Sequence, residues 1–148
     1  MTRQERTNRM NQVRQSIIET LSAGINWNSS MKSVMIVQIE RAKRFACNTI
    51  RPDFLRDKQK QWFDLLETQG LELKDQILHV DELRAEVQKR LLVGVKADAP
   101  VDAKNVMLNK AIGYVTYKTD KPAFMNDETW VQFVQSQAKV VRASFTAN

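Results

Sequence analysis

The stretch Glu40-Arg-Ala-Lys-Arg-Phe-Ala-Cys-Asn-Thr-Ile-Arg-Pro-Asp-Phe-Leu-Arg-Asp-Lys-Gln-Lys-Gln-Trp-Phe63 concentrates charge and aromatic rings as no other part of the chain does. Between Arg41 and Trp62 it has seven Lys or Arg residues against two acids. It also contains Pro52, and the residue before a proline avoids helical backbone. We therefore expect two helices that meet near Pro52 and share a basic surface.

The helix before Pro52 is expected to begin after Ser29 or Ser30, either of which can cap it. Its apolar residues recur at helical spacing and predict one buried face. That face consists of Met31, Val34, Met35, Ile39, Ala42, Phe45, Ala46 and Thr49. The helix after the break is expected to have Pro52 in its first turn, to extend to Gln69 and to end at Gly70.

The remainder of the chain predicts further helices. Thr2 and Glu5 have the spacing of a capping box, and Gly24 is a natural end for the helix that follows. Residues 71–93 fit one helical stripe better than a short strand, and residues 102–111 predict a short helix after a linker at 95–101. Residues 113–118 are rich in β-branched and aromatic residues and predict a short extended segment or a loop. A final helix is expected to start at Asn126 or Asp127, with Trp130, Val131, Val134, Ala138, Val141 and Phe145 on its apolar face.

Composition agrees with an all-α fold of about five or six helices. The 148 residues are 43% hydrophobic and 27% charged, which is typical of a globular chain. We expect a single domain over residues 1–148, with residues 1–14 as a basic arm. A single cysteine cannot form an internal disulfide, and no apolar run approaches the ~18 residues that span a bilayer. These features predict a cytoplasmic protein without a membrane partner.

The positive charge is concentrated at one end of the chain. Residues 1–60 have twelve Lys or Arg against five acids, whereas residues 61–100 have five against eight. Such asymmetry favours an acidic partner, most commonly nucleic acid, because binding to phosphates releases counterions. A solvated basic face that keeps the protein soluble is an equally good explanation from charge alone.

Signatures of catalysis and of cofactor binding are absent from the sequence. His79 is the only histidine, and no glycine-rich nucleotide loop or serine-hydrolase motif is present. Cys47 and His79 are a weak candidate for a nucleophile and its base. Asp53, Glu72 and Lys74 have the spacing of a metal-dependent nuclease, but that site requires carboxylates on adjacent strands. We therefore expect no enzyme activity, no cofactor and no metal, and keep a small nuclease as a minor alternative.

The basic residues provide the predicted binding site. Lysine and arginine bind phosphates without reading base sequence. Phe45, Phe54 and Trp62 are expected to be buried, and Trp27 either stacks on a base or covers the core. The candidate nucleic-acid-binding residues are Arg41, Lys43, Arg44, Arg51, Arg56, Lys58 and Lys60, with Arg3, Arg6, Arg9, Arg14 and Trp27.

These patterns predict a non-catalytic accessory subunit of a larger assembly that binds nucleic acid through its phosphate backbone. RNA or single-stranded DNA is favoured over sequence-specific duplex DNA, because a helix-turn-helix across residues 29–69 would lack the usual short turn. The alternative is an adaptor or inhibitor that docks its basic face on an acidic protein. Association with other protein subunits is expected in either case.

Overall fold

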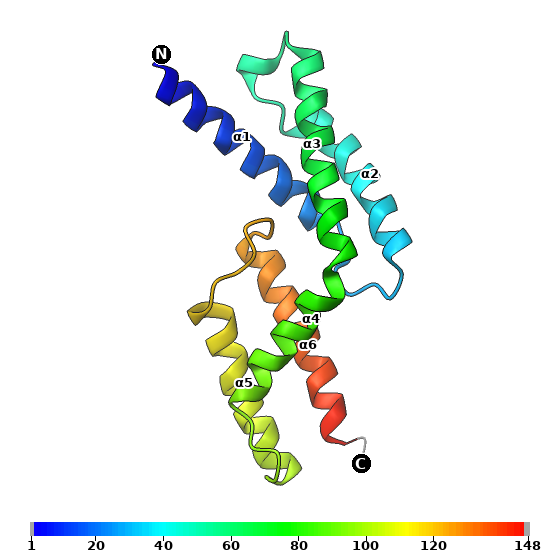
Figure 1. Ribbon diagram of the computed structural model, residues 1–148, viewed down its shortest axis with the longest axis vertical. Coiled ribbons are helices and arrows are strands. Elements are labelled where there is room, and N and C mark those ends of the chain that lie inside the picture. Colours follow the sequence, from blue (N-terminus) through cyan, green and yellow to red (C-terminus); the bar gives the residue numbers. More distant parts are fainter. Residues whose placement is uncertain (1, 147–148) are drawn as a thin grey trace. The chain divides into compact units, whose positions relative to one another are not determined.

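The computed structural model describes residues 2–146, which contain six α-helices, one 3-10 turn and no strand (Figure 1). The prediction of an all-α fold with five or six helices is confirmed. The elements are α1 (Arg3–Ala23), α2 (Lys32–Thr49), η1 (Asp53–Leu55), α3 (Gln59–Leu78), α4 (Val80–Val93), α5 (Val101–Lys118) and α6 (Asp127–Phe145). None of the helices in this part of the chain is long and apolar enough to cross a bilayer.

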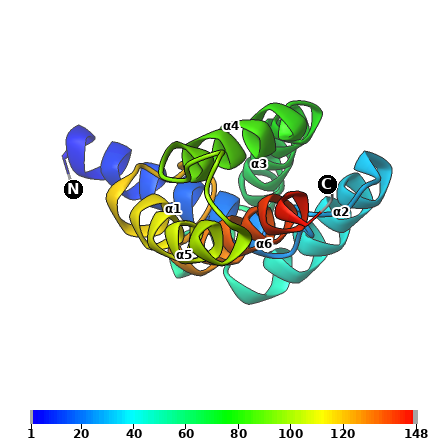
Figure 2. The same ribbon diagram turned by 90° about the horizontal axis from the view of Figure 1, so that it is seen from below.

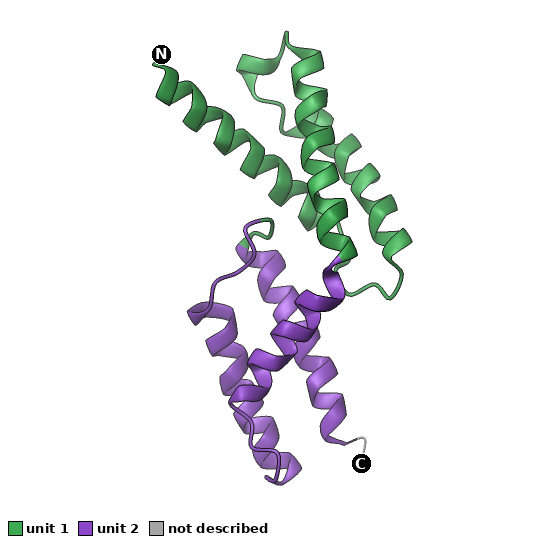
Figure 3. Ribbon diagram, viewed as in Figure 1, with its two compact units in different colours: residues 1–78, 124–126 green, residues 79–123, 127–148 purple. Residues whose placement is uncertain are grey.

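The chain forms two units, coloured separately in Figure 3. Unit 1 contains α1, α2, η1 and α3, together with residues 124–126. Its interior is built mainly from Ile17 and Leu21 of α1, Met35 and Ile39 of α2, and Trp62, Leu66, Leu73 and Ile77 of α3. Unit 2 contains α4, α5 and α6. The prediction of one domain over residues 1–148 stays a prediction.

Unit 2 is a three-helix arrangement in which every helix packs on the other two. Figure 2 shows α5 beside α6, with α4 on one side of this pair. The predicted apolar face of α6 is confirmed: all its members are buried except Val131, which is half-buried. The rest of the core comes from Val87 and Leu91 of α4 and from Leu108, Ala111 and Val115 of α5.

Helix α1 begins and ends where the sequence predicts. Thr2 and Glu5 form both hydrogen bonds of the capping box, and Gly24 follows the last helical residue. Gly24 also permits a close approach to α2, because a Cβ there would lie 3.1 Å from the Cβ of Ala42.

Helix α2 begins later than predicted: its N-cap is Met31, and the Ser29 hydroxyl accepts a hydrogen bond from the Met31 amide at 3.2 Å.

Helix α3 differs from the prediction at both ends. Pro52 precedes only the 3-10 turn, and α3 begins at Gln59 and continues past Gly70 to Leu78. The expected end at Gly70 is therefore wrong. Residues 71–78 are helical, as favoured, and His79 separates α3 from α4 with non-helical backbone.

Helix α5 corrects the prediction for residues 113–118. The segment is neither extended nor a loop, because α5 continues through it to Lys118, and extended backbone begins only after it, at Thr119. Val115 is buried in the core of unit 2, so tertiary packing outweighs the local β-propensity of this segment.

Gly113 lies inside α5 without a packing reason. A Cβ at this position would meet no atom within 4 Å. Glycine inside a helix costs roughly 1 kcal/mol relative to alanine, because it loses more backbone entropy on folding. We expect Gly113→Ala to raise the free energy of unfolding by about 0.5–1 kcal/mol in urea titrations followed by circular dichroism. A loss of stability would show that the space beside Gly113 is occupied.

Candidate nucleic-acid interface

The first half of α1 is a basic, solvent-exposed helix. Its four arginines, Arg3, Arg6, Arg9 and Arg14, are all exposed and are accompanied by a single acid, Glu5. Met10 and Val13 are only half-buried, so this half contributes little to the core of unit 1. The predicted basic arm is therefore an ordered helical extension whose cations face solvent on several sides.

Helix α2 separates the three of its cations that are predicted for the binding site. Arg41 and Arg44 are exposed and form no ion pair with any residue in the range 2–146. Lys43 is only 8% exposed, and its ammonium lies 2.7 Å from a carboxylate oxygen of Glu67 and 3.0 Å from one of Glu40. The prediction that Lys43 lies on the exposed basic surface is wrong. Its charge is already neutralised inside unit 1.

Gly70 explains how a lysine comes to be buried between α2 and α3. A Cβ at Gly70 would lie 3.1 Å from Cδ of Lys43 and 3.6 Å from Cγ2 of Ile39. The missing side chain therefore leaves room for the lysine stem to cross α3 and reach Glu67. Gly70 is buried inside α3, and this close packing accounts for a glycine in the middle of the helix.

Glu40 links this cluster to α3. It accepts from Lys43 and also lies 3.3 Å from the ammonium of Lys74. The Lys43 hydrogen bond, helped by Lys74, holds the pKa of Glu40 below its ordinary value of 4.5 in spite of partial burial. Burial alone would lower the pKa of Lys43, but the hydrogen bonds of Glu67 and Glu40 outweigh it and raise this pKa.

The lowered pKa of Glu40 predicts a pH-dependent contribution to stability. The contribution is fully present above the ordinary carboxyl pKa and is lost as the pH falls through the lowered folded-state pKa. We expect Glu40→Gln to reduce the free energy of unfolding by up to about 1 kcal/mol at pH 7, because the carboxylate is half-exposed. The difference from the parent protein should shrink as the pH is lowered below the ordinary carboxyl pKa of 4.5. A difference that stays the same from pH 7 to acidic pH, measured by urea unfolding, would contradict this ion pair.

Arg51 and Arg56 support the connection between α2 and α3. The Arg51 guanidinium donates to the backbone carbonyls of Leu55 and Arg56 and so holds the 3-10 turn in place. Arg51 is half-buried, so the prediction that it lies among the exposed cations is corrected. Arg56 is exposed but lies 3.3 Å from Asp53, in a surface pair of small energetic value.

The aromatic rings are placed only partly as predicted. Trp62 is fully buried and donates from Nε1 to the carbonyl oxygen of Cys47 at 3.2 Å, whereas Phe45 is 62% exposed. The expectation that Phe45 is buried is therefore wrong. Phe54 is half-buried, and the Arg9 guanidinium lies 4.1 Å from its ring centroid.

Trp27 covers the core and does not face solvent. It is 3% exposed, its Nε1 donates to the carbonyl oxygen of Ser22 at 2.9 Å, and its ring centroid lies 5.1 Å from that of Phe124. Of the two roles considered for Trp27, the structure supports the core cap. Stacking on a base would require the loop around it to open.

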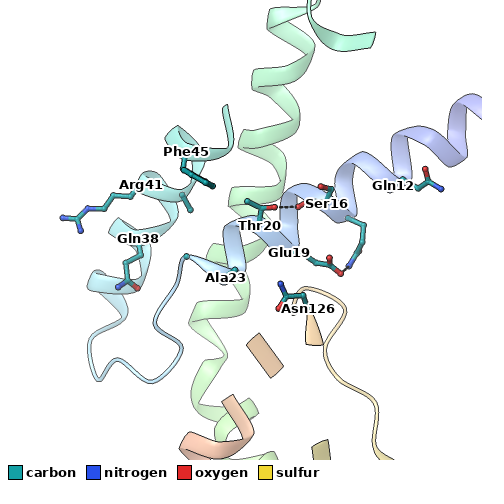
Figure 4. A pocket seen from close by; sticks show the side chains of 12 residues that line it. Gln12, Ser16, Glu19, Thr20, Ala23, Gln38, Arg41, Phe45 and Asn126 are labelled. Carbon is teal, nitrogen blue, oxygen red and sulfur yellow. Dashed lines mark hydrogen bonds between the residues drawn. The ribbon is translucent and has the colours of Figure 1, made fainter. Parts of the chain in front are cut away.

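A groove of about 850 Å³ lies between α1 and α2, and we call it the α1–α2 groove. Figure 4 shows its walls: Gln12, Ser16, Glu19, Thr20 and Ala23 come from α1, and Gln38, Arg41 and Phe45 come from α2. Most of these side chains are neutral hydrogen-bonding groups. The Arg41 side chain extends from the rim of the groove away from α1.

A smaller hollow of about 280 Å³ continues this surface towards the start of α1. It shares Gln12 and Ser16 with the groove and adds Arg9 and Phe54. The combined surface therefore has an arginine and a partly exposed phenylalanine at each end. Glu19 is the only acid among the residues that line the two hollows.

Three other cations predicted for the site line a separate cleft between α1 and the start of α3. Arg14, Lys58 and Lys60 lie there together with the acids Asp57 and Asp64, and Lys60 lies 3.4 Å from Asp64. The single basic ridge expected from the sequence is therefore divided. Each side has one cation more than its acids: the α1–α2 side has two arginines against one acid, and the cleft has three cations against two acids.

The alternative catalytic arrangements gain no geometric support. In the nuclease pattern, Asp53 pairs with Arg56, and Lys74 pairs with Glu40. Glu72 is exposed on α3, more than three turns beyond the start of that helix. His79 lies 3.5 Å from Glu82. Among residues 2–146 no three His, Cys, Asp or Glu side chains are grouped so that they could hold a metal ion.

Sequence reasoning missed the α1–α2 groove as a site. Its polar lining residues Gln12, Ser16 and Gln38 carry no motif, and their proximity depends on the packing of α1 against α2. The position of Phe45 at the edge of the apolar stripe of α2 is the only hint in the sequence, and the helical pattern predicts that this position is buried. The chain matches none of the protein-family models, curated proteins or solved structures with which we compared it.

Proposed function

We propose that unit 1 binds the sugar–phosphate backbone of RNA or single-stranded DNA along the α1–α2 groove, as a non-catalytic accessory subunit of a larger assembly. The observation that carries this proposal is the set of exposed arginines on α1 and α2 that have no acid partner among the described residues. These are Arg41 at the rim of the groove, Arg44, which lines a separate hollow between α2 and α3, and Arg6, which lies outside the lining of the groove. Arg9, which lies over Phe54, adds a fourth cation.

Each part of the groove has a counterpart in the chemistry of a nucleic-acid strand. Arginine and amide side chains donate hydrogen bonds to phosphate and sugar oxygens, and these contacts carry no base specificity. The exposed Phe45 ring offers a π-face to an unpaired base. The amides of Gln12 and Gln38 supply donors between the cations. This combination favours a single strand with its bases unpaired over a duplex.

An acidic protein segment is the second candidate. The observation in its favour is the apolar surface on α2 beside the arginines, where Met31, Val34 and Phe45 are all at least 40% exposed. Such residues at helical spacing are typical of a surface that receives an amphipathic helix.

Fluorescence anisotropy with a labelled random 20-nucleotide strand separates the two candidates. We expect saturable binding that unlabelled RNA or single-stranded DNA displaces and that polyglutamate of the same charge displaces much more weakly. Equal displacement by polyglutamate would assign the surface to acidic partners in general. Absence of binding at low salt would overturn the nucleic-acid proposal.

A further inference from the structure

Unit 2 has an exposed surface on α5 that its core does not explain. Tyr114 and Tyr117 are 62% and 77% exposed, which is unusual for rings of this size. They are separated by three positions, so they lie next to each other on the same side of the helix. We call the surface formed by Lys110, Gly113, Tyr114, Tyr117 and Lys118 the α5 tyrosine face.

Two lysines accompany the rings. Lys110 and Lys118 are exposed, and each lies four positions from Tyr114, so the three side chains follow one row along the helix. The row from Lys110 to Lys118 is about 12 Å long at 1.5 Å per residue. No ion pair within residues 2–146 neutralises either lysine. Cations therefore lie on both sides of the aromatic pair.

Gly113 leaves the backbone bare beside the rings. Helical side chains lean towards the helix N-terminus, so Tyr117 extends over the turn that contains Gly113. No atom lies within 4 Å of the place where a Cβ would be, and nothing in unit 2 needs a glycine there. A flat group can consequently approach the helix between Tyr114 and Tyr117.

We propose that the α5 tyrosine face is a second nucleic-acid contact, at which unpaired bases stack on Tyr114 and Tyr117 while Lys110 and Lys118 bind the flanking phosphates. Rings among cations are the combination that binds single strands without sequence preference. This inference rests on the proposed function of unit 1 and extends it, because it supplies stacking where the α1–α2 groove supplies mainly phosphate contacts.

The test compares Tyr114→Ala/Tyr117→Ala with the matched variant Tyr114→Phe/Tyr117→Phe. Each stacked base contributes roughly 5- to 150-fold in affinity, so we expect the alanine variant to bind a 20-nucleotide single strand at least about tenfold more weakly. The phenylalanine variant retains the rings and should stay within about threefold of the parent. Thermal unfolding should be nearly unchanged in both, because the side chains are exposed.

A second probe distinguishes stacking from charge. It also distinguishes failure of the α5 inference from failure of the proposed function of unit 1. An abasic 20-unit sugar–phosphate strand should bind the parent and the alanine variant equally. If the parent binds with steep salt dependence but the alanine variant retains full affinity for the base-bearing strand, the α5 inference is overturned and the groove proposal is unaffected. If the parent binds neither strand, both proposals are overturned. A phenylalanine variant as weak as the alanine variant would also contradict stacking.

Discussion

Replacing Trp62 with alanine is expected to destabilise unit 1 by about 3–5 kcal/mol, the largest loss among the substitutions considered. Trp62 is fully buried at the start of α3 and fills the space between α3 and the end of α2. Its indole N–H also satisfies the Cys47 carbonyl, which would lose its side-chain partner. Since small domains are stable by only 5–15 kcal/mol, much of unit 1 should unfold at moderate urea concentrations.

Two control substitutions make this test specific. Trp62→Phe retains most of the apolar volume and removes the hydrogen bond, so a loss of about 1–2 kcal/mol is expected. Phe45→Ala removes a ring from the neighbouring helix, but that ring is 62% exposed and its loss should cost about 0.5 kcal/mol or less. Urea unfolding by circular dichroism measures all three. Equal losses for Trp62→Ala and Phe45→Ala would contradict the placement of the two rings.

Reversing the charges of Arg41 and Arg44 is expected to give the largest loss of nucleic-acid affinity. Both side chains are exposed on α2 without an ion pair among residues 2–146, so Arg41→Glu/Arg44→Glu should leave the fold intact. Each substitution removes a phosphate contact and adds repulsion. We expect affinity for a labelled single strand to fall by about tenfold to a hundredfold. The slope of log K against log salt concentration should become shallower by the equivalent of about two phosphate contacts.

A matched variant in unit 2 controls for the change in net charge. Lys89→Glu/Lys139→Glu makes the same charge change at two exposed positions on α4 and α6, outside both proposed contacts. Its affinity should fall by less than about threefold, because only long-range attraction is reduced. Similar losses in the two double variants would mean that net charge, and not the surface beside the α1–α2 groove, determines binding.

The sequence predicts the helices better than it predicts their contacts. The capping box of Thr2 and Glu5 and the apolar stripe of α6 are local patterns, and both are confirmed. Lys43 could not be placed in this way, because its neutralising partner Glu67 lies on another helix. A helical projection shows that α2 has an apolar side but not which edge of that side α3 covers. The structure buries the Lys43 edge and exposes Phe45 at the other edge.

The same limit applies to the candidate site. Composition and spacing identify a basic region, yet they treat Arg41, Lys43, Arg51 and Lys60 alike. In the structure Lys43 and Arg51 stabilise unit 1, Lys60 pairs with Asp64, and Arg41 remains unpaired within the described residues. The glycines show a related effect. Gly70 accommodates a side chain from another helix, which no pattern within α3 could reveal.

The salt dependence of binding tests the central claim most directly. Affinity of the intact protein for a random 20-nucleotide single strand would be measured by anisotropy between about 50 and 300 mM salt. If Arg6, Arg9, Arg41 and Arg44 each bind a phosphate, log K should fall with log salt concentration with a slope of roughly −3, at about −0.7 per contact, and phosphate contacts of Lys110 and Lys118 would make the slope steeper. A slope near zero, or no binding at 50 mM salt, would contradict the account.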